Sequence, residues 1–183
     1  ELYGTPPEYV RGKMTKKKIS RSTIDDNLIL KEKRQALYSD VMHIDGQKFL
    51  ITTCEPLQLT LQCPITSESQ NQLGLGLQGH LSILRTKGFV PTIIHTDPAK
   101  GFTGLVGAFQ GVLVDTSGAG DNVPKVDAKI RRIKELYRCV KNGLPWILPK
   151  GMVKDLVAYA VARLNIRRTT ALSANVCPKV LFT

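Results

Sequence analysis

The chain of 183 residues lacks a long apolar run, a secretory leader pattern and a close cysteine pair. No stretch approaches the roughly 18 consecutive apolar residues of a membrane-spanning helix, so we expect no membrane association. The four cysteines are scattered without a CxxC pair, which argues against a disulfide scaffold or a structural zinc site and favours a reducing compartment. Because the chain starts at Glu1 and stops at Thr183, we expect it to be a piece of a longer polypeptide.

What the sequence does contain is a large and uneven positive charge, with 26 Lys and Arg, 15 Asp and Glu, and a net charge of +11. Residues 35–122 carry four cations and seven acids, whereas residues 123–168 carry twelve cations and three acids. Such a local density suits a polyanion, most often a nucleic acid. A solvated basic surface and contact with an acidic membrane surface are the alternatives.

The composition changes near residue 35. Residues 1–34 combine prolines, a Lys triplet and few apolar side chains, so we predict a basic linker that is extended or poorly ordered. Residues 35–183 are predicted to form one domain. Strands are expected at 37–42, 49–53, 57–61, 90–95 and 112–114, and helices at 66–87, 100–108, 122–142 and 149–164. This order indicates an α/β fold, with a mixed five-stranded sheet and helices on both faces.

The last two predicted helices each have an apolar stripe at helical spacing. In the first, the stripe consists of Val126, Ile130, Ile133, Tyr137 and Val140. In the second, it consists of Met152, Leu156, Tyr159 and Ala160. We expect both stripes to be buried against the sheet.

Three familiar motifs have weak support. Gly74, Gly76 and Gly79 match the GxGxxG dinucleotide fingerprint, but a polar run precedes them instead of a buried strand, so packing glycines within a helix are expected. His95 with Ser117 suggests a nucleophilic site, but no GxSxG elbow surrounds the serine. The three histidines have no short His or Cys pairing of the kind that binds zinc.

Two aspartates are more informative. Asp40 lies inside the first predicted strand and Asp97 at the end of the fourth. If these strands are neighbours, the two carboxylates can converge, and their mutual repulsion favours divalent cations between them. The alternative is a pair of exposed acids at strand ends.

A third acid lies on the long predicted helix, at Asp127. The cations at i+4, i+7, i+11 and i+14 share its face to within about 40°, at 100° per residue. They are Arg131, Lys134, Arg138 and Lys141. This arrangement is typical of a metal ligand that leads into a phosphate-binding stripe. A simple Asp127–Arg131 salt bridge on a solvated face is the alternative.

The segments 38–51, 93–97 and 123–134 resemble, in order, three blocks of the integrase core of copia-type LTR retrotransposons. Residues 165–182 are similar to the segment that closes this domain in copia polyproteins. The resemblance implies an RNase H-like fold with a triad of two Asp and one Glu that binds two Mg²⁺ (or Mn²⁺), and no organic cofactor. Asp40 and Asp97 match the two aspartates, and Asp127 lies where the family has glutamate. Arg131 and Lys134 lie where the family's helix grips element-end DNA.

The resemblance therefore implies a polynucleotidyl transferase that joins the 3′ ends of element DNA to target DNA. Asp40, Asp97 and Asp127 would be catalytic and bind metal, and the basic stripe would bind DNA. Self-association, and a location in the nucleus or in a cytoplasmic virus-like particle, are implied as well. Because aspartate is one methylene shorter than glutamate, a decayed or repurposed core that only binds DNA stays open, as does an RNase H-type nuclease.

Overall fold

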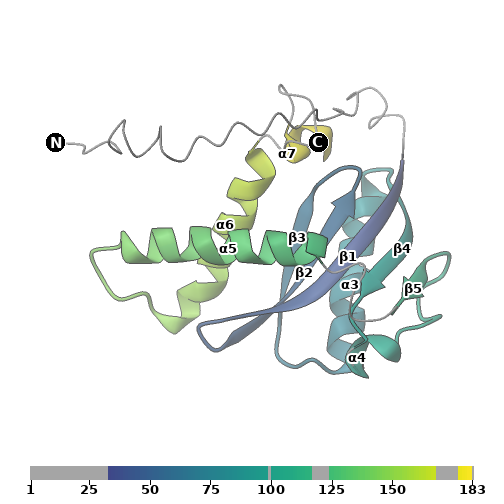
Figure 1. Cartoon of the computed structure of the whole chain (residues 1–183), viewed down its shortest axis with the longest axis horizontal. Coiled ribbons are helices and arrows are strands. Elements are labelled where there is room, and N and C mark those ends of the chain that lie inside the picture. The colour runs from purple at the N-terminus through teal and green to yellow at the C-terminus, as the bar shows by residue number, and fades with distance from the viewer. Residues whose placement is uncertain (1–32, 99, 117–123, 168–176, 183) are drawn as a thin grey trace.

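The computed structural model describes residues 33–98, 100–116, 124–167 and 177–182. Its five strands form one mixed sheet in the order β3-β2-β1-β4-β5 (Figure 1). The strands β1, β2 and β3 are antiparallel, whereas β4 and β5 run parallel to β1. The predicted mixed five-stranded sheet is thus confirmed. The bounds are β1 (Arg34–Ile44), β2 (Gln47–Glu55), β3 (Thr60–Ile65), β4 (Val90–Thr96) and β5 (Leu113–Asp115).

Helices cover both faces of the sheet, as predicted. One face carries α3 (Gln70–Thr86) and α4 (Lys100–Thr103), and the other carries α5 (Pro124–Asn142) and α6 (Val153–Ile166). A 3₁₀ turn, η1 (Lys150–Met152), precedes α6, and the short α7 (Pro178–Phe182) packs against the α3 side through Leu181. No helix among the described residues has a stretch long and apolar enough to cross a membrane.

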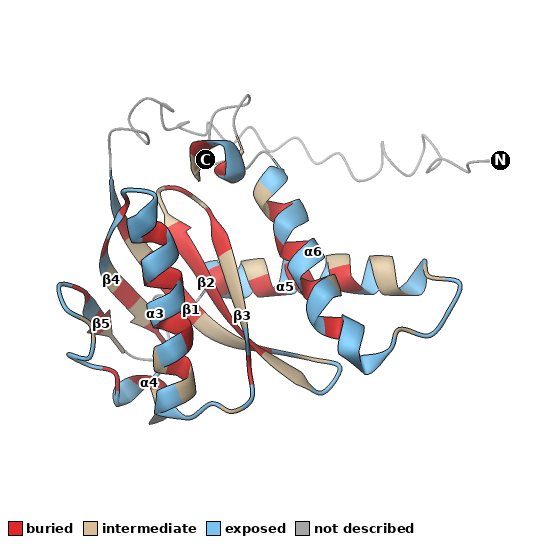
Figure 2. Ribbon diagram, turned by 180° about the vertical axis from the view of Figure 1, so that it is seen from behind, coloured by how far each residue is buried: buried red, intermediate tan, exposed pale blue. Residues whose placement is uncertain are grey.

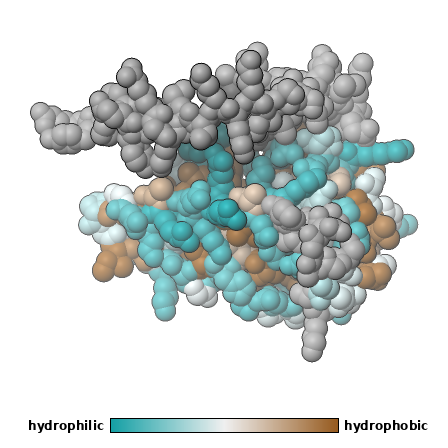
Figure 3. Space-filling view, in the orientation of Figure 1, coloured by the Kyte–Doolittle hydropathy of each residue, from teal (hydrophilic) through white to brown (hydrophobic). Residues whose placement is uncertain are grey.

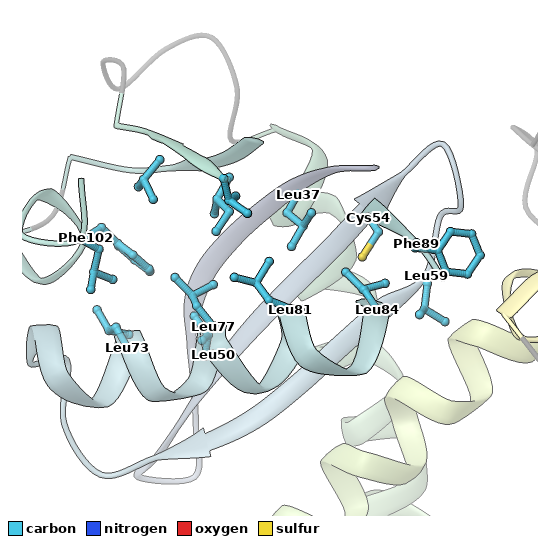
Figure 4. Close-up of a cluster of buried hydrophobic side chains, with 14 of the residues drawn as sticks. Leu37, Leu50, Cys54, Leu59, Leu73, Leu77, Leu81, Leu84, Phe89 and Phe102 are labelled. Carbon is cyan, nitrogen blue, oxygen red and sulfur yellow. The ribbon is translucent and has the colours of Figure 1, made fainter. Parts of the chain in front are cut away.

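The sheet buries a separate cluster on each face because successive strand residues point to opposite sides. Leu37 and Leu50 face α3, whose buried leucines meet them at helical spacing (Figure 4). Tyr38, Phe49 and Ile51 face α5 and α6 instead. Figure 2 shows the buried residues of the helices on the sides that face the strands.

The GxGxxG motif lies inside α3, not in a turn between a strand and a helix. A Cβ atom on Gly76 would lie 2.8 Å from Cδ2 of Leu50, so this glycine lets the helix approach β2 closely. The expectation of packing glycines is confirmed for Gly76 and for Gly74, where a Cβ would lie 3.2 Å from Cδ2 of Leu105, but not for Gly79, where it would meet no atom within 4 Å.

Several details of the prediction are wrong. The third strand begins at Thr60, because the chain turns over 55–59, with Gln58 at φ +59° and a hydrogen bond of 2.8 Å from Cys54 N to Leu59 O. The helix at residue 100 ends at Thr103, before the predicted end at 108. The buried face of α6 is also rotated: Met152 and Tyr159 are exposed, and the buried positions are Val153, Val157, Ala160, Val161 and Leu164.

The stripe of α5 is confirmed from Val126 to Tyr137. Val140, its last predicted member, is half-buried and lies outside the cluster. Arg34, assigned to the linker, begins β1, and the rest of the predicted linker up to residue 32 lies outside the described residues. At the far edge of the sheet, Asn165 bonds the backbone of Thr60 twice, accepting at 2.9 Å and donating at 2.7 Å.

Candidate active site

The structure places Asp40 and Asp97 next to each other. Strands β1 and β4 are adjacent and parallel, and their register pairs Ser39 with Thr96. Asp40 is the next residue of β1, and Asp97 directly follows β4. Both line one cavity of about 270 Å³. The two carboxylates that the sequence separates by 57 positions therefore share one site.

Asp127 lies in the first turn of α5 and does not line the cavity, but its charge acts on Asp40. Burial is the main cause that raises the pKa of Asp40, and the charges of Asp97 and Asp127 raise it further. A hydrogen bond of 2.6 Å from the backbone N–H of Val41 acts in the opposite direction, as does His43. Both other acids are thus close enough to repel Asp40 electrostatically.

Two further residues of the cavity, His43 and Glu68, were not predicted from the sequence. Oε1 of Glu68 lies 2.7 Å from Nζ of Lys48 and 3.1 Å from Nε2 of His43. The hydrogen bond from Lys48 is the main cause that lowers the pKa of Glu68. The sequence feature that could have indicated Glu68 is its position immediately before Ser69, because the side chain of Ser69 caps α3.

Side chains of β1, β4 and β5 contact one another next to the two aspartates in the sequence. Tyr38 and His95 each precede one of the aspartates by two residues, and their rings stack at 4.9 Å with an interplanar angle of 19°. Nδ1 of His95 lies 3.1 Å from Oδ2 of Asp115. Ser117, the other member of the weakly supported nucleophilic pair with His95, lies outside the described residues.

The turn of α5 that carries Asp127 is tied to the sheet through Lys125. Its Nζ donates to Glu55 Oε2 at 2.5 Å and to the hydroxyl of Tyr38 at 3.2 Å. The same ammonium lies 4.6 Å from the centre of the Tyr38 ring. Lys125 therefore fixes the start of α5 across β1 and β2.

The predicted basic stripe divides into two parts. Arg131 and Arg138 are exposed and Lys134 is half-buried, and none of them pairs with an acid among the residues that the structure describes. The Asp127–Arg131 salt bridge is accordingly not formed. Lys141 instead donates to Asp45 at 2.5 Å, so its charge is engaged by the hairpin between β1 and β2.

The donor chemistry fits a divalent cation. Asp40 and Asp97 supply hard oxygen donors at one cavity, and Mg²⁺ is commonly held by one or two carboxylates while it keeps several waters. Within the described ranges, no three His, Cys, Asp or Glu side chains are already assembled closely enough to hold a metal ion. Asp40 and Asp97 therefore present their carboxylates at the cavity, and Asp127 is not among the residues that line it.

Gly101 forms part of the cavity wall and leaves no room for a side chain. A Cβ atom there would collide with the backbone carbonyl of Glu68 and lie 2.6 Å from Cδ1 of Leu73. We expect Gly101→Ala to lower the free energy of unfolding by about 2 kcal/mol in urea denaturation, because α4 must move away from the start of α3. Gly104→Ala is the matched control, since its Cβ would meet the flexible end of Gln70. Equal losses in both variants would contradict the backbone collision.

The chain is similar to known proteins in structure but matches none of those compared by sequence. No family model matches the chain, and no curated protein is similar to it in sequence. Among solved structures, the chain is similar to the catalytic core domain of BIV integrase, with a TM-score of 0.60 and 15% sequence identity. The match covers 80% of this chain and 92% of that domain. The predicted RNase H-like, integrase-core fold is thereby confirmed.

Proposed function

We propose that this chain is the catalytic core of a metal-dependent DNA integrase, which joins the 3′ ends of an element DNA to target DNA. The observation that carries the proposal is the convergence of Asp40 and Asp97 at one cavity, with Asp127 on the facing helix, in an integrase-core fold. The three sequence blocks at 38–51, 93–97 and 123–134 support a copia-type LTR retrotransposon as the source.

Asp40 and Asp97 would hold Mg²⁺ or Mn²⁺, with Asp127 as the third ligand. When bound, such ions activate a hydroxyl nucleophile and stabilise the leaving oxygen at a phosphodiester. The nucleophile is a 3′-hydroxyl of element DNA during joining, or water during end processing. Lys125 holds the turn of α5 that presents Asp127, through its bonds to Glu55 and Tyr38.

The exposed side of α5 would bind DNA. Arg131, Lys134 and Arg138 are the cations of the predicted stripe that pair with no acid among the described residues, and phosphate contacts of this kind give affinity and salt dependence but no sequence preference. Lys141 joins them only when its pair with Asp45 opens, so we assign it the smaller part. Element-end DNA and target DNA are the proposed partners, together with further copies of the chain. The proposed location is the nucleus or a cytoplasmic virus-like particle.

A second candidate is a decayed or repurposed core that binds DNA without catalysis. The short side chain of Asp127 favours it, as does the lack of an assembled group of three metal ligands among the described residues. An RNase H-type nuclease on the same fold is the third candidate.

The test is the reversal of strand joining on a branched DNA, a reaction that we expect an isolated core to perform without further domains. We expect product with Mg²⁺ or Mn²⁺ and none with EDTA, while polarisation of labelled DNA reports binding separately. Binding without joining, with or without metal, would support the non-catalytic core. Cleavage of an RNA–DNA hybrid without joining would support the nuclease. A silent chain that gains activity on Asp127→Glu would identify an intact scaffold whose third ligand is too short.

A further inference from the structure

The connection between α5 and α6 presents large apolar side chains to solvent. Ile147 is 93% exposed, Trp146 is 47% exposed and Met152 is 44% exposed. Figure 3 shows hydrophobic atoms at the left end of this face, where the connection lies, beside hydrophilic side chains along α5. Isolated apolar side chains are normal on a surface, but neighbouring ones mark interaction sites.

Contacts with the hairpin between β1 and β2 hold the connection and the end of α5 in place. Gln47 donates to the backbone carbonyl of Lys150 at 2.7 Å, and Asp45 accepts a bond of 2.7 Å from the hydroxyl of Tyr137. Leu148 packs against the cluster under α5 and α6. The backbone that carries the exposed side chains is therefore already held in place, so little further ordering of the connection is needed on binding.

The surrounding charge is mainly positive, although Asp45 pairs with Lys141 and the acids Glu135 and Asp155 lie just outside the connection. Residues 136–154 contain four cations and no acid, and the cations are Arg138, Lys141, Lys150 and Lys154. A second copy of the chain would bring the same positive charge to this surface, which disfavours self-association here. Cations around the exposed Trp146 and its aliphatic neighbours are complementary to a nucleic acid, whose phosphates pair with the cations while a base stacks on the indole ring.

We propose that the α5–α6 connection is a second DNA-contacting element, in which Trp146 stacks on a base, Ile147 wedges between bases and Lys150 contacts a phosphate. The inference rests on the proposed function, because its ligand is the DNA bound along α5. About 22 Å of helix separates Asp127 from the end of α5. The contact therefore affects DNA affinity and leaves the chemical step unchanged.

Trp146 is the only tryptophan of the chain, so its emission reports this element directly. We expect duplex or single-stranded oligonucleotides to quench the emission with the same midpoint as the polarisation of labelled DNA. DNA binding without quenching would overturn the inference and leave the proposed function intact, whereas no DNA binding at all would contradict both. A change of emission with protein concentration alone would assign the element to a second copy. A change only with phosphatidylserine vesicles would assign it to a membrane surface, and either result would overturn the inference.

Variants separate stacking from charge. Trp146→Ala should weaken DNA binding about tenfold without changing its salt dependence, and Trp146→Phe should retain most of the affinity. Lys150→Gln should reduce the slope of log affinity against log salt by about one. Leu75→Ala is the matched control, because Leu75 is 58% exposed on α3, across the sheet, and its loss should not change the affinity. Wild-type affinity in Trp146→Ala would overturn the inference.

Discussion

Replacement of Asp97 by asparagine is expected to lower metal-dependent strand joining on the order of 10³-fold. Asparagine keeps the size of the side chain and one acceptor oxygen, but it replaces the other oxygen by an NH₂ donor and removes the charge that favours a divalent cation. Asp40 would then be the single carboxylate on the strand side of the cavity. We expect the rate of product formation on branched DNA to fall to background at all Mg²⁺ concentrations, and a higher concentration of Mn²⁺ to restore only part of it.

The same substitution should leave the fold at least as stable as before. Asp97 repels Asp40, so removal of one of two neighbouring like charges relieves an unfavourable interaction in the native state. Thermal unfolding of Asp97→Asn is therefore expected at an equal or higher temperature than that of the wild type. A loss of activity together with a gain of stability separates a metal ligand from a residue that merely supports the fold.

Asp155→Asn provides the matched control for this experiment. Asp155 lies exposed in the first turn of α6, outside the cavity, and the same chemical change there should leave joining near the wild-type rate. Wild-type activity in Asp97→Asn, in a preparation that is itself active, would refute the role proposed for Asp97. Equal losses in the two variants would point to a general effect of charge on DNA binding.

The sheet could be predicted because its signals are local. Asp45-Gly46 forms the turn between β1 and β2, with both residues at positive φ, and the β-branched run after Phe89 forms β4. The buried face of α6 could not be predicted in the same way. Its sequence carries two overlapping apolar stripes, and packing against α5 and β3 selects the one with Val157 over the one with Tyr159.

The site was partly predictable for a similar reason. Asp40 and Asp97 each stand at a recognisable place on a strand, and adjacency of the two strands is enough to bring them together. Glu68 enters the cavity through the position of α3, which no local pattern fixes. The pair Asp45–Lys141 joins residues 96 positions apart, so the spacing of cations on a helix did not reveal that one of them is engaged.

A buried polar chain beneath β1 leads to the second large effect. Oγ of Ser39 lies 2.9 Å from Oγ1 of Thr52, which in turn lies 2.9 Å from Nδ1 of His80 on α3. His80 is 2% exposed. Burial lowers the pKa of His80 from 6.5 to about 4, against a smaller opposite effect of the backbone of Gln62. The imidazole is therefore neutral in the native protein at pH 7.

His80 should make the fold sensitive to mild acid. Above pH 6.5 the ring is neutral in both the folded and the unfolded chain, so it adds no pH dependence. Between pH 6.5 and about 4 the unfolded chain binds a proton that the native chain does not. The free energy of unfolding should fall by up to about 1.4 kcal/mol per pH unit, or roughly 3 kcal/mol over this range.

Urea denaturation of wild type and His80→Gln at a series of pH values checks this. Glutamine keeps an amide near Thr52 but does not titrate, so the stability difference between the two proteins should shrink by roughly 3 kcal/mol from pH 7 to pH 4. Thr52→Val removes the hydrogen bond to His80 but leaves the ring buried. Because burial is the main cause of the low pKa of His80, the free energy of unfolding of this variant should change with pH as steeply as that of the wild type. A stability difference that does not change with pH would mean that the native ring accepts a proton freely, contrary to its burial between α3 and the sheet.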